Sequence, residues 1–196
     1  SSLMVANAWF GLLANNCQDI AMDRIRIGYC LTNSVFTNAS VDFTQSILDQ
    51  NLFAGMQILG GSTVRVSNCM LRDSAKMCVA LEGGNMEIRN SILEVPESAG
   101  DERCAYFVRS TTTRARLVSN YNNIRVGEGA AVANYAGGLS DRFLIDWQIS
   151  TSFSNDISSF GYDPDFADAD ARDFHLKSQY GRYDPVAKTY VTNDTE

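Results

Sequence analysis

The chain has 196 residues, of which 45% are hydrophobic and 20% are charged, and its formal net charge at neutral pH is −7. This apolar content suffices for a folded core and argues against a disordered chain. The acidic balance disfavours nucleic acid and anionic membrane surfaces as partners, and no run of 18 apolar residues predicts a membrane span.

Two short stretches in the first forty residues, 25–27 and 33–36, have the composition of β-strands. Their distance from the strands that follow does not match a regular repeat. We therefore expect them on another face of the same fold, and the sequence does not fix their register.

Three later blocks, 41–48, 64–71 and 86–93, repeat one pattern, and their starts are 23 and 22 residues apart. Each block begins with an apolar, a polar and an apolar residue, which is the periodicity of a β-strand. A fixed period of this length predicts stacked structural repeats. No helix-length amphipathic segment lies between the blocks, so the chain is predicted to form a parallel β-helix with coils of about 22 residues.

A fourth coil is predicted at 115–120, with Ala115 aligned to Met86 and Tyr106 aligned to Met77. The extra residues in this coil are assigned to the polar segment 96–103, which is expected to form an inserted loop.

Stacking these blocks predicts columns of side chains along the fold. Apolar residues form the inward columns. The outward column alternates in charge, which predicts a stabilising ladder of ion pairs rather than a binding stripe for a charged polymer. Its members are Asp42, Arg65, Glu87 and Arg116.

The residues at the bend after each strand are Gln45, Asn68, Asn90 and Ser119. Buried amide side chains could hydrogen-bond along such a column. In this feature the chain resembles the pectate-lyase-like superfamily of right-handed parallel β-helices, over roughly residues 25–145. The resemblance implies an all-β, right-handed parallel β-helix with an irregular C-terminal segment.

The C-terminal region contains the stretches 162–166 and 173–178, which resemble the segment that ends many large bacterial β-helix repeat proteins. Such proteins are mostly secreted or surface-attached, so an extracellular or cell-surface location is implied. We expect β-helix coils in residues 1–150 and an acidic C-terminal segment or cap in residues 151–196. The chain could be a fragment of a larger protein.

The C-terminal segment also carries the clearest candidate metal site. Closely spaced carboxylates suit Ca²⁺, although a solvated turn explains the same composition. The candidate ligands are Asp163, Asp165, Asp168 and Asp170, with Asp173 nearby, and no other cofactor is expected.

The chain has five cysteines, an odd number without a C-x-x-C pair. This pattern favours free, buried thiols over a disulfide framework.

The function expected from these features is a non-catalytic structural, adhesive or glycan-binding module, with polysaccharide or other surface proteins as partners. One alternative is a lyase or glycoside hydrolase acting on an acidic polysaccharide, which needs several acids and a base in one groove. Asp42 and Glu87 could supply a carboxylate pair, but Arg65 between them favours the ladder. A second alternative is a segment of a phage tail fibre or spike.

Overall fold

The structure is a computed structural model that describes residues 3–72, 74–97, 103–109, 116–136, 138–152, 154–168, 173–176, 182–184 and 189–191. The chain divides into two compact units, Ser1–Tyr162 and Asp163–Glu196. In the described residues of the second unit there are two antiparallel strand pairs. These are β19 (Phe166–Asp168) with β20 (Asp173–Leu176), and β21 (Arg182–Asp184) with β22 (Thr189–Val191).

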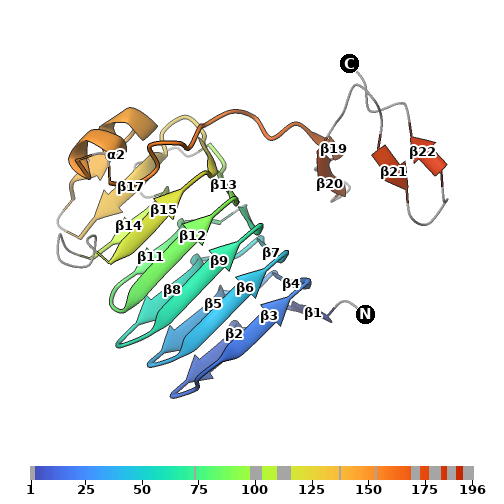
Figure 1. Ribbon diagram of the computed structural model, residues 1–196, viewed down its shortest axis with the longest axis horizontal. Helices are drawn as coiled ribbons and strands as arrows, with labels where there is room; N and C mark the ends of the chain where they lie inside the picture. Colours follow the sequence, from blue (N-terminus) through green and yellow to red (C-terminus); the bar gives the residue numbers. More distant parts are fainter. Residues whose placement is uncertain are drawn as a thin grey trace. The chain divides into compact units, whose positions relative to one another are not determined.

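The first unit consists of three sheets, here named A, B and C (Figure 1). Sheet A contains β1 (Leu3–Ala6), β4 (Ile25–Gly28), β7 (Ile47–Asp49), β10 (Met70–Arg72), β13 (Ile92–Val95) and β16 (Asn123–Val126). Sheet B contains β2 (Phe10–Asn15), β5 (Thr32–Thr37), β8 (Ala54–Leu59), β11 (Met77–Leu81), β14 (Cys104–Val108), β17 (Ala131–Tyr135) and β18 (Ser140–Asp141). Sheet C contains β3 (Ile20–Asp23), β6 (Ser40–Thr44), β9 (Thr63–Ser67), β12 (Asn85–Arg89) and β15 (Leu117–Asn120).

Each full coil contributes one strand to sheet B, then one to sheet C, then one to sheet A, and successive coils pair in parallel. The predicted all-β parallel β-helix is therefore confirmed. The repeated blocks of the sequence begin with the strands of sheet C, where Val41, Val64 and Met86 lie opposite one another. Residues 25–27 and 33–36 lie in sheets A and B, which explains why their spacing did not fit that repeat.

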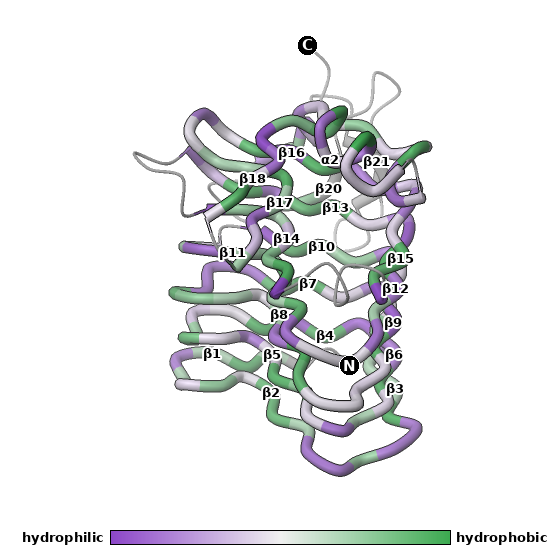
Figure 2. Tube along the Cα trace, turned by 90° about the vertical axis from the view of Figure 1, so that its left-hand side faces the viewer, coloured by the Kyte–Doolittle hydropathy of each residue, from purple (hydrophilic) through white to green (hydrophobic). Residues whose placement is uncertain are grey.

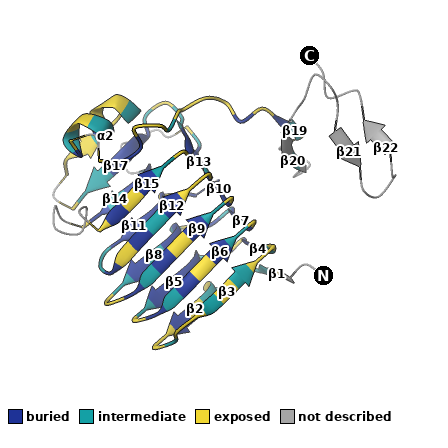
Figure 3. Ribbon diagram, in the orientation of Figure 1, coloured by how far each residue is buried: buried dark blue, intermediate teal, exposed yellow. Residues whose placement is uncertain are grey.

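The core fills the space between the three sheets. Within β9 the burial alternates, with Val64 and Val66 buried and Arg65 exposed between them. The same bands of buried and exposed residues cross successive strands in Figure 3. Each aliphatic side chain that is fully buried contributes roughly 1.5–3 kcal/mol to stability, so the stacked apolar columns are the main stabilising feature.

The register predicted for the fourth coil is wrong by two residues. Met86 lies opposite Leu117, not Ala115, and Val79 rather than Met77 lies opposite Tyr106. Arg116 consequently lies in the turn before β15, outside the charge ladder.

The error arises because the extra residues occur at two corners rather than one. Cys104 follows Met86 by 18 residues (104 − 86), whereas Met77 follows Val64 by 13 (77 − 64). Leu117 follows Cys104 by 13 residues (117 − 104), whereas Met86 follows Met77 by 9 (86 − 77). The connection between β14 and β15 therefore contains a second insertion. Residues 98–102 of the predicted insertion lie outside the described residues.

Single residues with left-handed backbone conformations turn the chain at the corners. At the corner between sheets C and A, φ lies between 49° and 59° in every coil. This conformation costs most L-residues free energy, although asparagine tolerates it best. The corner residues are Arg24, Gln45, Asn68, Asn90 and Tyr121.

Glycine is required at one corner between sheets B and C. Gly84 has a φ of +70°, and a Cβ at this position would lie 2.4 Å from the backbone oxygen of Ser62. Gly138 has a φ of +85° but no atom within 4 Å of such a Cβ. We expect Gly138→Ala to cost about 1 kcal/mol for backbone strain alone, and Gly84→Ala to cost about 3 kcal/mol because overpacking is added. Urea denaturation of both variants measures the difference, and equal losses would contradict the steric account.

The end of the stack that follows β15 and β17 is covered by α2 (Leu144–Ser150) (Figures 1 and 2). Trp147 of this helix is fully buried and stacks on Tyr106 with ring centroids 5.5 Å apart. The Asp156 carboxylate, also fully buried, accepts hydrogen bonds from Trp147 Nε1 at 2.9 Å, Ser119 Oγ at 2.8 Å and Ser159 Oγ at 2.7 Å. These contacts fix the cap to the last coil.

Candidate functional site

A groove of about 580 Å³ lies on the outer face of sheet B. It crosses β11, β14 and β17 and ends against the turn that leads into β18. The lining residues are Phe53, Lys76, Met77, Glu82, Phe107, Asn134, Tyr135, Gly138, Leu139 and Ser140.

Two side-chain columns on the outer face of sheet B lie at this groove, and each contributes to its lining. Small or flexible apolar residues occupy equivalent positions of four strands, and they form a second hydrophobic cluster outside the main core. Phe53 and Phe107 pack against this cluster and remain partly exposed. The first column contains Ala54, Met77, Cys104 and Ala131, and the second contains Gln57, Ala80, Phe107 and Asn134. Of these columns, Met77, Phe107 and Asn134 line the groove, together with Phe53.

Polar side chains line the groove beside the aromatic rings. Gln57 Nε2 donates a hydrogen bond to Glu82 Oε1 at 2.6 Å, and Arg109 Nη1 lies 3.7 Å from Glu82 Oε2. Among the described lining residues, Glu82 is the only carboxylate. Amide and carboxylate groups next to aromatic rings can bind hydroxyl groups while the rings contact an apolar face of the same ligand.

Cys104 lies in the first of these columns, opposite Met77, and is fully buried. Burial raises the pKa of its thiol to about 12. Because the thiolate is the nucleophilic form, this cysteine is inert at neutral pH. Burial likewise raises the pKa of Cys69 to about 11. All five cysteines are free thiols, as predicted.

The predicted charge ladder is confirmed at one step. Arg65 Nη1 lies 3.2 Å from Asp42 Oδ1. Glu87 is opposite Arg65 in register and forms an ion pair at 2.6 Å with Arg89 of its own strand. The side chains of all four residues are 41–57% exposed, and pairs of this kind contribute at most about 1 kcal/mol. In the next strand the outward position belongs to Val118.

The prediction of a buried amide ladder is wrong, because Gln45, Asn68 and Asn90 are exposed. Their left-handed backbone turns the side chain outward and the following residue inward. Those inward residues provide the hydrogen bonds: Ser91 Oγ accepts from the backbone N–H of Cys69 at 3.2 Å.

An amide pair does occur at the corner between sheets B and C. Asn38 Nδ2 donates to Asn16 Oδ1 at 3.3 Å, and Asn38 Oδ1 accepts from the N–H of Gly61.

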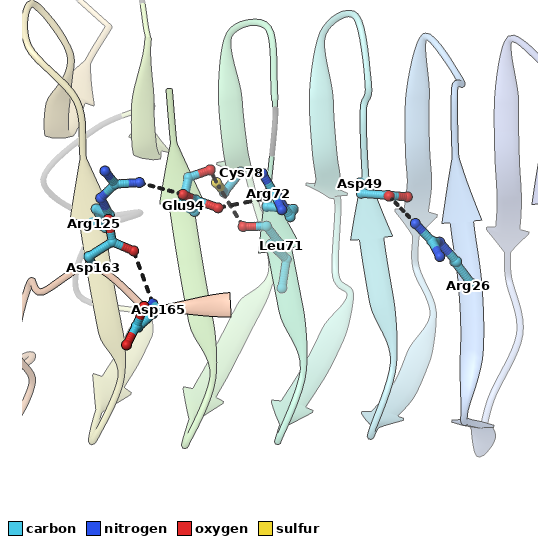
Figure 4. Close-up of polar contacts among 9 residues, drawn as sticks. All are labelled: Arg26, Asp49, Leu71, Arg72, Cys78, Glu94, Arg125, Asp163 and Asp165. Carbon is cyan, nitrogen blue, oxygen red and sulfur yellow. Dashed lines mark hydrogen bonds and ion pairs between the residues drawn. The ribbon is translucent and has the colours of Figure 1, made fainter. Parts of the chain in front are cut away.

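A second charge column, on sheet A, was not predicted. Asp49, Arg72, Glu94 and Arg125 lie opposite one another on β7, β10, β13 and β16. Glu94 Oε1 lies 2.6 Å from Arg125 Nη1, and its Oε2 lies 3.2 Å from Arg72 Nε (Figure 4). Asp49 Oδ2 pairs instead with Arg26 at 2.6 Å. The sequence signal was the alternation of these charges four residues after the corner residues Gln45, Asn68, Asn90 and Tyr121, in the second half of the repeat.

The predicted calcium ligands are described in part. Asp163 Oδ1 accepts a hydrogen bond from the backbone N–H of Asp165 at 3.0 Å, which closes a local turn (Figure 4). Asp168 lies in β19, and Asp170 lies outside the described residues. Within the described part of the chain, no three His, Cys, Asp or Glu residues are grouped to hold a metal ion. Calcium binding by this segment stays a prediction.

Comparison of the chain with protein-family models, curated proteins and solved structures gives no match. The helices in the described residues are all too short or too polar to span a membrane.

Proposed function

We propose that this chain is a non-catalytic glycan-binding module whose site is the groove on sheet B. The observation that carries the proposal is the pairing of two partly exposed aromatic rings, Phe53 and Phe107, with polar side chains in one groove. A pyranose ring has an apolar face of C–H groups and a rim of hydroxyls. It can therefore lie on an aromatic ring while Glu82 and Asn134 accept or donate hydrogen bonds at its edge.

The chemistry of the groove supports binding rather than hydrolysis. Enzymes that cleave glycosidic bonds with two carboxylates hold them about 5–9.5 Å apart. Glu82 has no second acid beside it among the described lining residues, and it is already bonded to Gln57 and close to Arg109.

As part of the same proposal, the chain is related to pectate-lyase-like and bacterial surface β-helix proteins. Coils of three parallel sheets with a groove on the outer face of sheet B support it. An extracellular or cell-surface location is proposed with it, because long polysaccharides are encountered there. The structural or adhesive role expected from the sequence would then follow from glycan attachment.

Phe107→Ala is expected to weaken glycan binding about tenfold, because one aromatic stacking contact contributes roughly 0.5–1.5 kcal/mol beyond its buried area. A panel of neutral and acidic oligosaccharides is first screened for binding to the unmodified chain. The best ligand is then titrated calorimetrically into the variant. Phe160→Ala serves as the matched control, since Phe160 is 47% exposed and lies outside the groove.

Two results would count against the proposal. Absence of binding to every oligosaccharide in the panel would contradict the proposed function. Equal affinities for Phe107→Ala and Phe160→Ala would contradict the proposed location of the site. Release of reducing ends or unsaturated uronates from pectin or alginate would instead support the enzymatic alternative.

A further inference from the structure

A second groove, of about 360 Å³, lies on sheet A along the corner that each coil turns after sheet C. Leu48, Leu71 and Leu93 of its strands are buried in the core, so the residues before them face outward. The groove crosses β7, β10 and β13, and it shares no lining residue with the groove on sheet B. Its lining residues are Gln45, Ser46, Ile47, Asn68, Cys69, Met70, Asn90 and Ile92.

One wall of this groove is a row of exposed amides, with one side chain from each of three successive coils. Gln45, Asn68 and Asn90 have left-handed φ values of 50°, 54° and 49°. The backbone N–H of Gln45 donates to Ser67 O and that of Asn68 donates to Arg89 O, both at 3.3 Å, which fixes the corner. No described residue hydrogen-bonds to the three amide side chains. Their donors and acceptors are therefore available to a ligand.

The floor of the groove is aliphatic. Ile47, Met70 and Ile92 lie opposite one another in register, with Met70 8% exposed and the two isoleucines half-buried. The described lining residues include no charged group. The charged column of sheet A lies two residues further along the same strands, where Asp49 and Glu94 are paired with arginines. The groove therefore suits an uncharged ligand that carries both hydrogen-bonding groups and small apolar groups.

We propose that this groove is a second binding site, which takes a chain of N-acetylated hexosamines. An acetamido group has one N–H, one C=O and one methyl group. The side-chain amide of Asn or Gln has donors and an acceptor, so it can bond both polar atoms of the acetamido group. The methyl group then lies on the aliphatic floor, which removes its surface from water.

The spacing of the amide row favours a chain over a single sugar. Successive amides are separated by one strand spacing, about 4.8 Å, which is close to the length of one pyranose unit in a linear glycan. A chain that runs along the coil stack therefore meets a new amide with each sugar. The described lining residues contain no aromatic ring, so the amides rather than ring stacking recognise the ligand. The two grooves share no lining residue, so either site can exist without the other.

The test titrates two neutral hexasaccharides into the full 196-residue chain by calorimetry. The N-acetylglucosamine hexamer carries the acetamido groups, and cellohexaose has the same linkage with a hydroxyl group in place of each. We expect the N-acetylated hexamer to bind at least about tenfold more tightly, because cellohexaose leaves the amide row without its partners.

Asn68→Gly removes the central amide of the row and keeps a residue that readily adopts the left-handed conformation. It should weaken binding of the N-acetylated hexamer about tenfold, since the bonds to both polar atoms are lost. Asn16→Gly is the matched control, because Asn16 is also exposed, has a φ of 53° and lies outside both grooves. Asn90→Gly repeats the test if circular dichroism shows that Asn68→Gly is not folded.

Three results would overturn the proposal. The first is equal affinity for the two hexasaccharides, or binding of neither. The second is equal affinity of Asn68→Gly and Asn16→Gly for the N-acetylated hexamer. The third is loss of binding in Phe107→Ala, which alters the groove on sheet B and should leave the affinity for this hexamer unchanged.

Discussion

Asp156→Ala is expected to lower the free energy of unfolding by about 3–5 kcal/mol, the largest effect of a single substitution that we predict for this chain. The carboxylate bonds Trp147, Ser119 and Ser159 in a fully buried environment. Its removal leaves several donors without an acceptor, and each such group costs about 1–3 kcal/mol. For a chain of this length the loss corresponds to a melting temperature lower by roughly 10 °C or more.

The cap can be observed directly through tryptophan fluorescence. Of the two tryptophans, Trp147 is fully buried and Trp9 is 77% exposed, so a Trp9→Phe background reports the cap alone. Asp156→Asn keeps the size and one acceptor oxygen and should lose less stability than Asp156→Ala. Asp42→Ala, which removes an exposed ion pair, is the control. Equal melting temperatures for Asp156→Ala and Asp42→Ala would show that the hydrogen bonds of Asp156 do not hold the cap.

Glu94→Gln is expected to destabilise the chain by about 3 kcal/mol, because it removes the carboxylate that faces two arginines in a buried column. The side chain of Glu94 is 9% exposed, and that of Arg72 is 10% exposed. Loss of an anionic neighbour lowers the stability far more at a buried arginine than at a surface arginine, since water does not replace the lost interaction. Thermal melting followed by circular dichroism provides the measurement.

Glu87→Gln is the matched control for the buried column. Glu87 pairs with Arg89 at 2.6 Å, as short as the Glu94–Arg125 contact, but its side chain is 41% exposed. The control should therefore cost at most about 1 kcal/mol, and its cost should shrink in high salt. The Glu94→Gln effect should persist in about 1 M salt, where exposed pairs are screened. Equal losses for the two variants at low salt would refute a special role for the column.

The period of the sequence was sufficient to predict the coil architecture. Alternating residues in 41–43, 64–66 and 86–88 can bury one face only if equivalent strands stack, and the structure pairs them in that register. The identity of the first charge pair, Asp42 with Arg65, followed from the same alignment. These features depend on neighbours one repeat apart, and a repeat places such neighbours in contact wherever its length is constant.

Features that depend on the corners could not be predicted in this way. Because insertions occur at two corners, Leu117 rather than Ala115 lies opposite Met86. Composition alone does not say how the extra residues are divided between the two loops. The outward direction of Asn68 and Asn90 follows from a left-handed φ that the sequence does not specify. An amide is equally compatible with a buried ladder and with an exposed bend.

The candidate site and the cap were decided by the tertiary structure alone. Phe53 and Phe107 are 54 residues apart (107 − 53) and line one groove because sheet B brings β8, β11 and β14 together. Asp156 binds Ser119 across 37 residues at a place where the repeat has ended. The sequence by itself determined the coil and its strand pairing, because these follow from local periodicity. Only the folded chain determined the groove and the closed end, because they depend on residues outside the repeat and on how the strands of sheet B are brought together.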